Sequence, residues 1–137
     1  MIRENGRAKA YRPLPEAARR AAVAAGLEAY GQGDFFLAHE LLEPAWMGAS
    51  DPAERALDSG LIKVAAAFVH AVRGNAAGVT KNLEGARIRL RNGLAAGPAF
   101  GIDVAAVLAQ VDLSLAAVGR GESPSPVELT RMEVSVR

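Results

Sequence analysis

Residues 34–47 read D-F-F-L-A-H-E-L-L-E-P-A-W-M, and no other stretch holds aromatic and ionisable side chains so densely. They include two of the four phenylalanines, the only tryptophan and one of the two histidines. At about 100° per residue, the apolar side chains fall on one helical face. That face is formed by Phe35, Ala38, Leu42, Ala45 and Trp46. Because Asp34 can accept a hydrogen bond from a first-turn N–H, we predict an amphipathic helix that begins after it.

Pro44 interrupts this predicted helix on the side opposite the apolar face. A proline inside a helix removes one backbone hydrogen bond, and its ring clashes with the preceding turn. The apolar face nevertheless continues through Trp46. We therefore expect a bend at Pro44, with the proline on the solvent side, and not a break.

Four further helices are predicted around this stretch, over residues 15–30, 52–73, 76–94 and 104–118. Their expected starts coincide with Pro15, with Asp51-Pro52 and with Asn75, residue types that favour a helix N-terminus. Glycine-containing turns follow them. The helix over residues 52–73 is apolar on most of its circumference, so we expect it at the centre of the fold.

The composition suits closely packed helices. Hydrophobic residues make up 50% of the 137 residues but aromatic residues only 5%, so alanine, leucine and valine must fill the core. A chain of 14.3 kDa has the size of one domain. We predict an all-α, single-domain bundle of about five helices. It divides into a basic N-terminal arm (1–14), a helical domain (15–119) and an extended C-terminal tail (120–137).

Several classes of protein are disfavoured. The chain has no cysteine, which excludes disulfides and thiolate metal sites. No stretch approaches the roughly 20 consecutive apolar residues of a membrane helix, and the first residues lack the apolar run of a signal peptide. We expect a soluble, cytoplasmic protein with no membrane partner. The net charge of +1 disfavours nucleic acid, which remains the last alternative through the basic arm and the helix over 76–94.

A set of short motifs follows in a characteristic order. These are His39-Glu40-x-x-Glu43-x-x-Trp46, then Gly60-Leu61-Ile62-x-x-Ala65-Ala66, His70 and Arg73-Gly74-Asn75. Their order and spacing, over residues 30–94, resemble the bacterial and archaeal family catalogued as domain of unknown function 309. The resemblance implies a compact all-helical domain and supplies no biochemical activity. The chain departs from the family at Pro44, and at Ser59 and Lys63, where family members often carry glutamine.

The H-E-x-x-E motif suggests two kinds of polar site. His39 and Glu43 lie at i and i+4, so their side chains can converge and bind a divalent metal, with Glu40 and His70 assisting. The motif lacks the second histidine of the zincin pattern H-E-x-x-H. If Lys63 instead pairs with Glu43, the same residues form a structural ionic network between two helices.

The favoured function is a non-enzymatic binding or scaffold module that self-associates. Its polar pocket is expected at His39, Glu43, Lys63 and His70, with Trp46 beside it, and would recognise a small polar ligand or partner. The first alternative is a metal-dependent hydrolase with His39 and Glu43 as metal ligands; acid/base catalysis by His39, oriented by Glu43, is another.

Overall fold

The computed structural model describes residues 2–4, 7–9, 11–129 and 131–132. The long helices are α1 (Glu16–Gly31), α2 (Phe35–Gly48), α3 (Pro52–Val72), α4 (Ala76–Asn92) and α5 (Val104–Gly119). Two short 3-10 helices, η1 (Leu94–Ala96) and η2 (Pro98–Phe100), connect α4 to α5. The predicted all-α class is confirmed. A small antiparallel hairpin of β1 (Ile2–Glu4) and β2 (Arg7–Lys9) precedes the helices, with Ile2 opposite Lys9, and the sequence does not predict this pairing.

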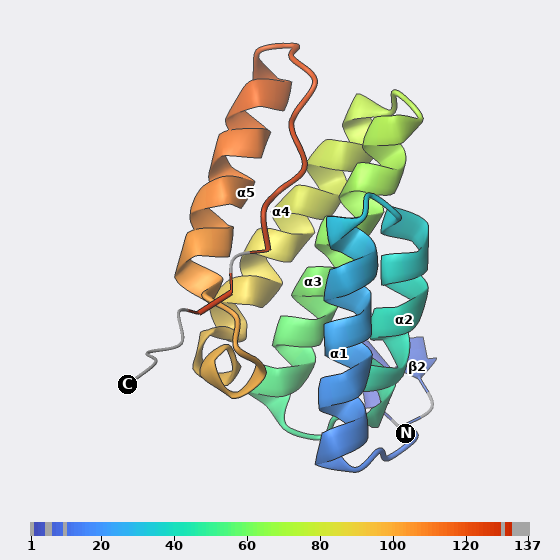
Figure 1. Cartoon of the computed structure of the whole chain (residues 1–137). Helices are drawn as coiled ribbons and strands as arrows, with labels where there is room; N and C mark the ends of the chain where they lie inside the picture. The colour runs from blue at the N-terminus through green and yellow to red at the C-terminus, as the bar shows by residue number, and fades with distance from the viewer. Residues whose placement is uncertain (1, 5–6, 10, 130, 133–137) are drawn as a thin grey trace.

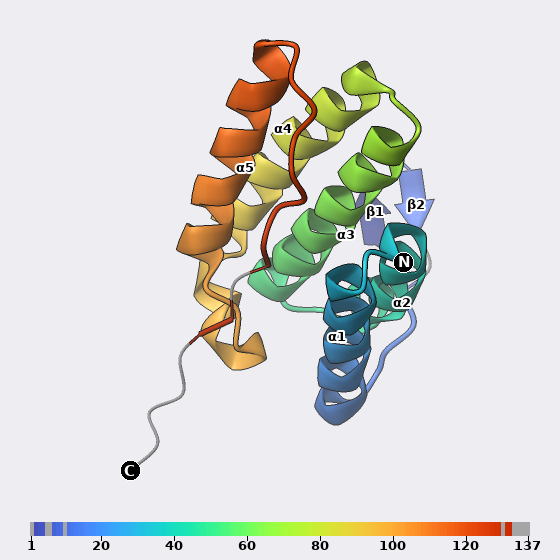
Figure 2. The same cartoon turned by 45° about the horizontal axis from the view of Figure 1, so that its top comes forward.

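Helices that follow one another in the chain pack together: α1 on α2, α2 on α3, α3 on α4, and α4 on α5 (Figure 1). The helix α3 lies between α2 and α4, as Figure 2 shows from a second direction. Its Leu57, Leu61 and Val64 are fully buried, which confirms the central position predicted for this helix.

Side-chain caps explain where four of the helices begin. In each, the residue before the first turn accepts a hydrogen bond from a backbone N–H three residues later, which satisfies a donor that the helix itself leaves unpaired. The pairs are Asp34 with Leu37, Asp51 with Glu54, Asn75 with Gly78, and Asp103 with Ala106. The caps predicted at Asp34, Asp51 and Asn75 are thereby confirmed.

The helix α2 continues through Pro44, whose side of the helix is exposed, so the expected absence of a break is confirmed. Its apolar face packs inward: Leu42 is fully buried and Trp46 is 8% exposed. The ring centroid of Phe35 lies 5.8 Å from that of Phe68 on α3. These side chains therefore contribute to the packing of α2 against α3.

The residues after α5 return along the bundle as an extended segment. We call residues 122–129 and 131–132 the C-terminal strap. Figure 1 shows it in red, running between α5 and the layer that contains α1. Val127 is 1% exposed, and its carbonyl accepts a hydrogen bond from Tyr30 Oη at 2.6 Å. The strap ends against the connection between η2 and α5, where Met132 N donates to Gly101 O at 2.9 Å.

Among the described residues, no helix combines the length and the apolar character that crossing a membrane requires.

Candidate functional site

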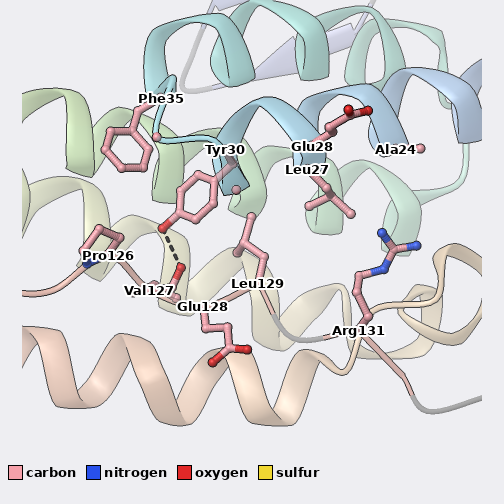
Figure 3. A pocket seen from close by; sticks show the side chains of 12 residues that line it. Ala24, Leu27, Glu28, Tyr30, Phe35, Pro126, Val127, Glu128, Leu129 and Arg131 are labelled. Atoms are coloured by element: carbon pink, nitrogen blue, oxygen red, sulfur yellow. Dashed lines mark hydrogen bonds between the residues drawn. The ribbon is translucent and has the colours of Figure 1, made fainter.

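A groove with a volume of about 610 Å³ lies between α1 and the C-terminal strap (Figure 3). We call it the strap groove. One wall comes from α1 and the start of α2, and the other from the strap. Its lining residues are Ala24, Leu27, Glu28, Tyr30, Gly31, Gly33, Phe35, Pro126, Val127, Glu128, Leu129 and Arg131. Most of these side chains are apolar, so the groove offers water-excluding walls to a ligand.

Tyr30 forms the middle of the α1 wall and fixes the strap. Its ring meets Phe35 edge-on at a centroid distance of 5.1 Å and Phe68 at 6.4 Å. Its hydroxyl donates to Val127 O. Burial raises the pKa of the Tyr30 phenol above its ordinary value, so the side chain stays neutral at physiological pH. Tyr30 therefore acts as an apolar wall and a tether, and not as a general base.

Charged side chains occupy the edges of the strap groove. Figure 3 shows Glu28 and Glu128 pointing away from each other toward opposite rims, and Phe35 and Arg131 at opposite ends. Arg131 Nε donates to Gly101 O at 3.1 Å, which holds this end of the strap. The lining contains no histidine, serine, threonine or lysine.

A second hollow of about 400 Å³ adjoins the strap groove, and both share Ala24, Leu27 and Arg131. We call it the arginine compartment, because Arg20 and Arg131 line it. The guanidinium of Arg20 lies 5.7 Å from the ring centroid of Phe100 and donates to Ala99 O at 2.5 Å. The remaining lining is apolar or glycine.

The residues of the H-E-x-x-E motif lie elsewhere, on α2. His39 Nδ1 is 3.8 Å from Glu40 Oε1, and the His39 ring stacks on Phe36 at a centroid distance of 6.5 Å. His39 Nδ1 is buried without a hydrogen-bond partner among the described residues. Glu43 is exposed, and it forms no ion pair with any residue that the structure describes.

The other residues predicted for the polar pocket have separate surroundings. Lys63 extends toward α4, where a Cβ added at Gly85 would lie 2.9 Å from its Cδ. His70 Nδ1 lies 3.1 Å from Asn75 Nδ2 at the turn between α3 and α4. The described part of the chain contains no group of three His, Asp or Glu side chains placed to hold a metal ion. The metal-binding and ligand-binding roles of these residues stay predictions.

Trp46 is packed as an anchor. The guanidinium of Arg55 lies 4.7 Å from its ring centroid, and Arg55 Nη1 donates to Trp46 O at 2.6 Å. Trp46 Nε1 is buried and has no hydrogen-bond partner among the described residues. These contacts tie the C-terminal end of α2 to the first turn of α3.

Asp58 is a buried acid that the sequence does not reveal. It is fully buried on α3, and neither carboxyl oxygen has a hydrogen-bond partner in the described structure. Burial and the nearby charge of Glu54 raise the pKa of Asp58 to about 8, against the opposing charges of Arg19 and Arg55. Glu54 is itself engaged by Arg19, with Nε to Oε2 at 2.6 Å. Asp58 is therefore mainly protonated at neutral pH.

Residues 23–82 match the model of the family described as Domain of unknown function (DUF309). This match confirms the resemblance that the motifs on α2 and α3 indicate. Searches of curated proteins and of solved structures gave no significant match. The α1 wall of the strap groove lies inside the matched residues, whereas the strap wall lies outside them.

Proposed function

We propose that the protein is a binding module which holds a small, mainly apolar ligand in the strap groove. The match of residues 23–82 to the DUF309 model assigns no activity to the chain. The observation that carries this proposal is the size of the groove together with its walls. Small-molecule sites commonly have volumes of about 300–1,000 Å³, apolar walls and a few polar groups. The strap groove, at about 610 Å³, has all three properties.

The contacts of the walls also favour binding. Leu27 and Tyr30 are already held by the core, and Val127 is held by its hydrogen bond to Tyr30, so both walls are ordered before a ligand arrives. A preformed site loses less conformational entropy on binding than a site that must fold around its ligand. The order of both walls therefore favours binding in the groove.

A substitution that fills the groove tests the proposal. Ala24 lines both hollows and is exposed, so Ala24→Trp should occupy ligand space without disturbing the core. The probe is the neutral dye N-phenyl-1-naphthylamine, whose emission rises in apolar surroundings. We expect saturable enhancement with the wild-type protein and at least tenfold weaker binding, roughly 1.4 kcal/mol, with Ala24→Trp.

The matched control is Ala21→Trp, which adds the same side chain at an exposed position of α1 outside both hollows. It should bind the dye like the wild type, and circular dichroism should show the same helicity for all three proteins. The proposal is wrong if the wild type shows no saturable enhancement, or if Ala24→Trp binds as tightly as Ala21→Trp.

The polar pocket around His39, Glu43, Lys63 and His70 is a competing location for the ligand of the same module. The double variant His39→Ala/Glu43→Ala separates the two locations, because neither residue lines the strap groove. The polar pocket would be favoured if this double variant lost dye binding while Ala24→Trp bound the dye as tightly as the wild type. Self-association stays a prediction, which sedimentation velocity tests directly.

A further inference from the structure

We propose that the ligand of the strap groove is a single-chain amphiphile with one negative charge, such as a medium-chain carboxylate. Its apolar chain lies in the strap groove, and its head group lies between Arg20 and Arg131 in the arginine compartment. This inference rests on the proposed function and adds the chemical class of the ligand.

The arginine compartment suits an anionic head group. Two of its lining residues are arginines, none is a carboxylate, and the rest are apolar or glycine. The hydrogen bond from Arg131 Nε to Gly101 O leaves the Nη–H donors of Arg131 for a ligand. A guanidinium matches a carboxylate with two parallel hydrogen bonds, which are strong because both partners are charged. An anion is therefore the complementary occupant.

The charges nearby favour a single negative charge. Arg20 Nη2 pairs with Glu16 Oε1 at 2.9 Å, and Glu16 lies outside the hollow. This pair offsets one of the two positive charges. About one positive charge remains for a head group, and a monoanion balances it.

The geometry also sets the direction of the ligand. The two hollows share Ala24 and Leu27, so a continuous apolar path on α1 joins them. Arg131 lies at the end of the strap groove opposite Phe35, as Figure 3 shows. Glu28 and Glu128 disfavour an anion along the rims of the strap groove. The chain of the ligand therefore extends from Arg131 toward Tyr30 and Phe35.

Isothermal titration with octanoate, decanoate and dodecanoate, below the concentrations at which they form micelles, tests the apolar chain. Burial of one methylene contributes about 0.8 kcal/mol, so Kd should fall about fourfold for each added methylene until the groove is full. Decanoate should bind more tightly than uncharged 1-decanol, and decyltrimethylammonium should bind most weakly. The opposite order of the three would overturn the proposal.

Substitutions at the two arginines test the head group. Arg20→Gln and Arg131→Gln should each weaken decanoate binding roughly tenfold or more and change 1-decanol binding less than twofold. Arg73→Gln removes an exposed arginine at the turn between α3 and α4, outside both hollows, and should have no effect. Glu28→Gln should tighten decanoate binding, because it removes a repelling carboxylate from the rim.

The outcomes separate this inference from the proposed function. Equal binding of 1-decanol and decanoate, unchanged by either arginine substitution, would overturn the anionic head group and leave an apolar groove. Both proposals would be refuted if no amphiphile bound to the protein and Ala24→Trp left the binding of the neutral dye unchanged.

Discussion

Asp58 is a fully buried acid on α3 whose pKa is strongly raised. Burial and Glu54 raise its pKa from 3.8 to about 8, so the folded protein holds a proton there that the unfolded chain releases above about pH 4. The stabilising effect of that proton is complete below about pH 4 and is lost progressively as the pH rises toward about 8. The free energy of unfolding should therefore fall across this window and level off above it.

The variant Asp58→Asn tests this pH dependence, because an amide stays neutral at every pH and has nearly the same shape. We expect the stability of Asp58→Asn relative to the wild type to rise with pH, by at most about 1.4 kcal/mol per unit between about pH 4 and 8. Urea denaturation at a series of pH values measures it. Parallel curves for the two proteins would show that Asp58 ionises normally in the folded state.

The same residue shows where reasoning from the sequence ends. Asp34, Asp51 and Asn75 were predictable caps, because capping depends on residues within one turn of the helix. The burial of Asp58 depends on how distant segments pack around α3, including Arg19 of α1, which pairs with the neighbouring Glu54. No local pattern distinguishes a buried aspartate from an exposed one on a helix that is apolar on most sides.

At the scale of elements, glycine sets how closely α3 and α4 approach. A Cβ added at Gly60 would lie 2.7 Å from Cγ and Cδ2 of Leu90 and 3.2 Å from the backbone nitrogen of Leu90. Leu90 is fully buried, so it has little space in which to move. The helix α3 therefore requires a glycine at this position for packing, although glycine is an unfavourable helix residue.

Gly60→Ala should consequently lower the free energy of unfolding, by about 1–3 kcal/mol for overpacking, and Tm by several degrees. The control is Gly119→Ala in the last turn of α5, where a Cβ would meet nothing within 4 Å. That substitution should be neutral, or stabilising by up to about 1 kcal/mol. Thermal melts of both variants measure the difference. Equal Tm values would contradict the close contact between α3 and α4.

The candidate site was less predictable than the helices. The expected polar pocket followed from i, i+4 spacing on one helix, and it stays a prediction; the structure places His39 beside Phe36 and His70 beside Asn75. The strap groove instead depends on Tyr30 meeting Val127, which lies 97 residues later in the chain. The sequence predicted an extended tail over residues 120–137, but nothing local indicated which surface it covers.

At the scale of the whole molecule, the C-terminal strap joins the two ends of the helical series. The helices pack in chain order, so α1 and α5 lie on opposite sides of the fold. The strap connects them, because Ser125 O accepts from Ser114 Oγ of α5 at 3.4 Å and Val127 O accepts from Tyr30 of α1. It therefore forms a wall of the strap groove and also links α1 to the rest of the bundle.

Val127→Ser should loosen this link, because it places a hydroxyl where an apolar side chain is 1% exposed. Loss of the buried apolar surface should lower the free energy of unfolding by about 1.5–3 kcal/mol. The neighbouring Glu128→Ser changes an exposed side chain, so its effect should stay within about 0.5 kcal/mol. Hydrogen exchange should show faster exchange in α1 in Val127→Ser, because Tyr30 of α1 donates to the Val127 carbonyl. Uniformly faster exchange in every helix would contradict a specific link to α1, because it would mean that Val127→Ser destabilises all helices equally.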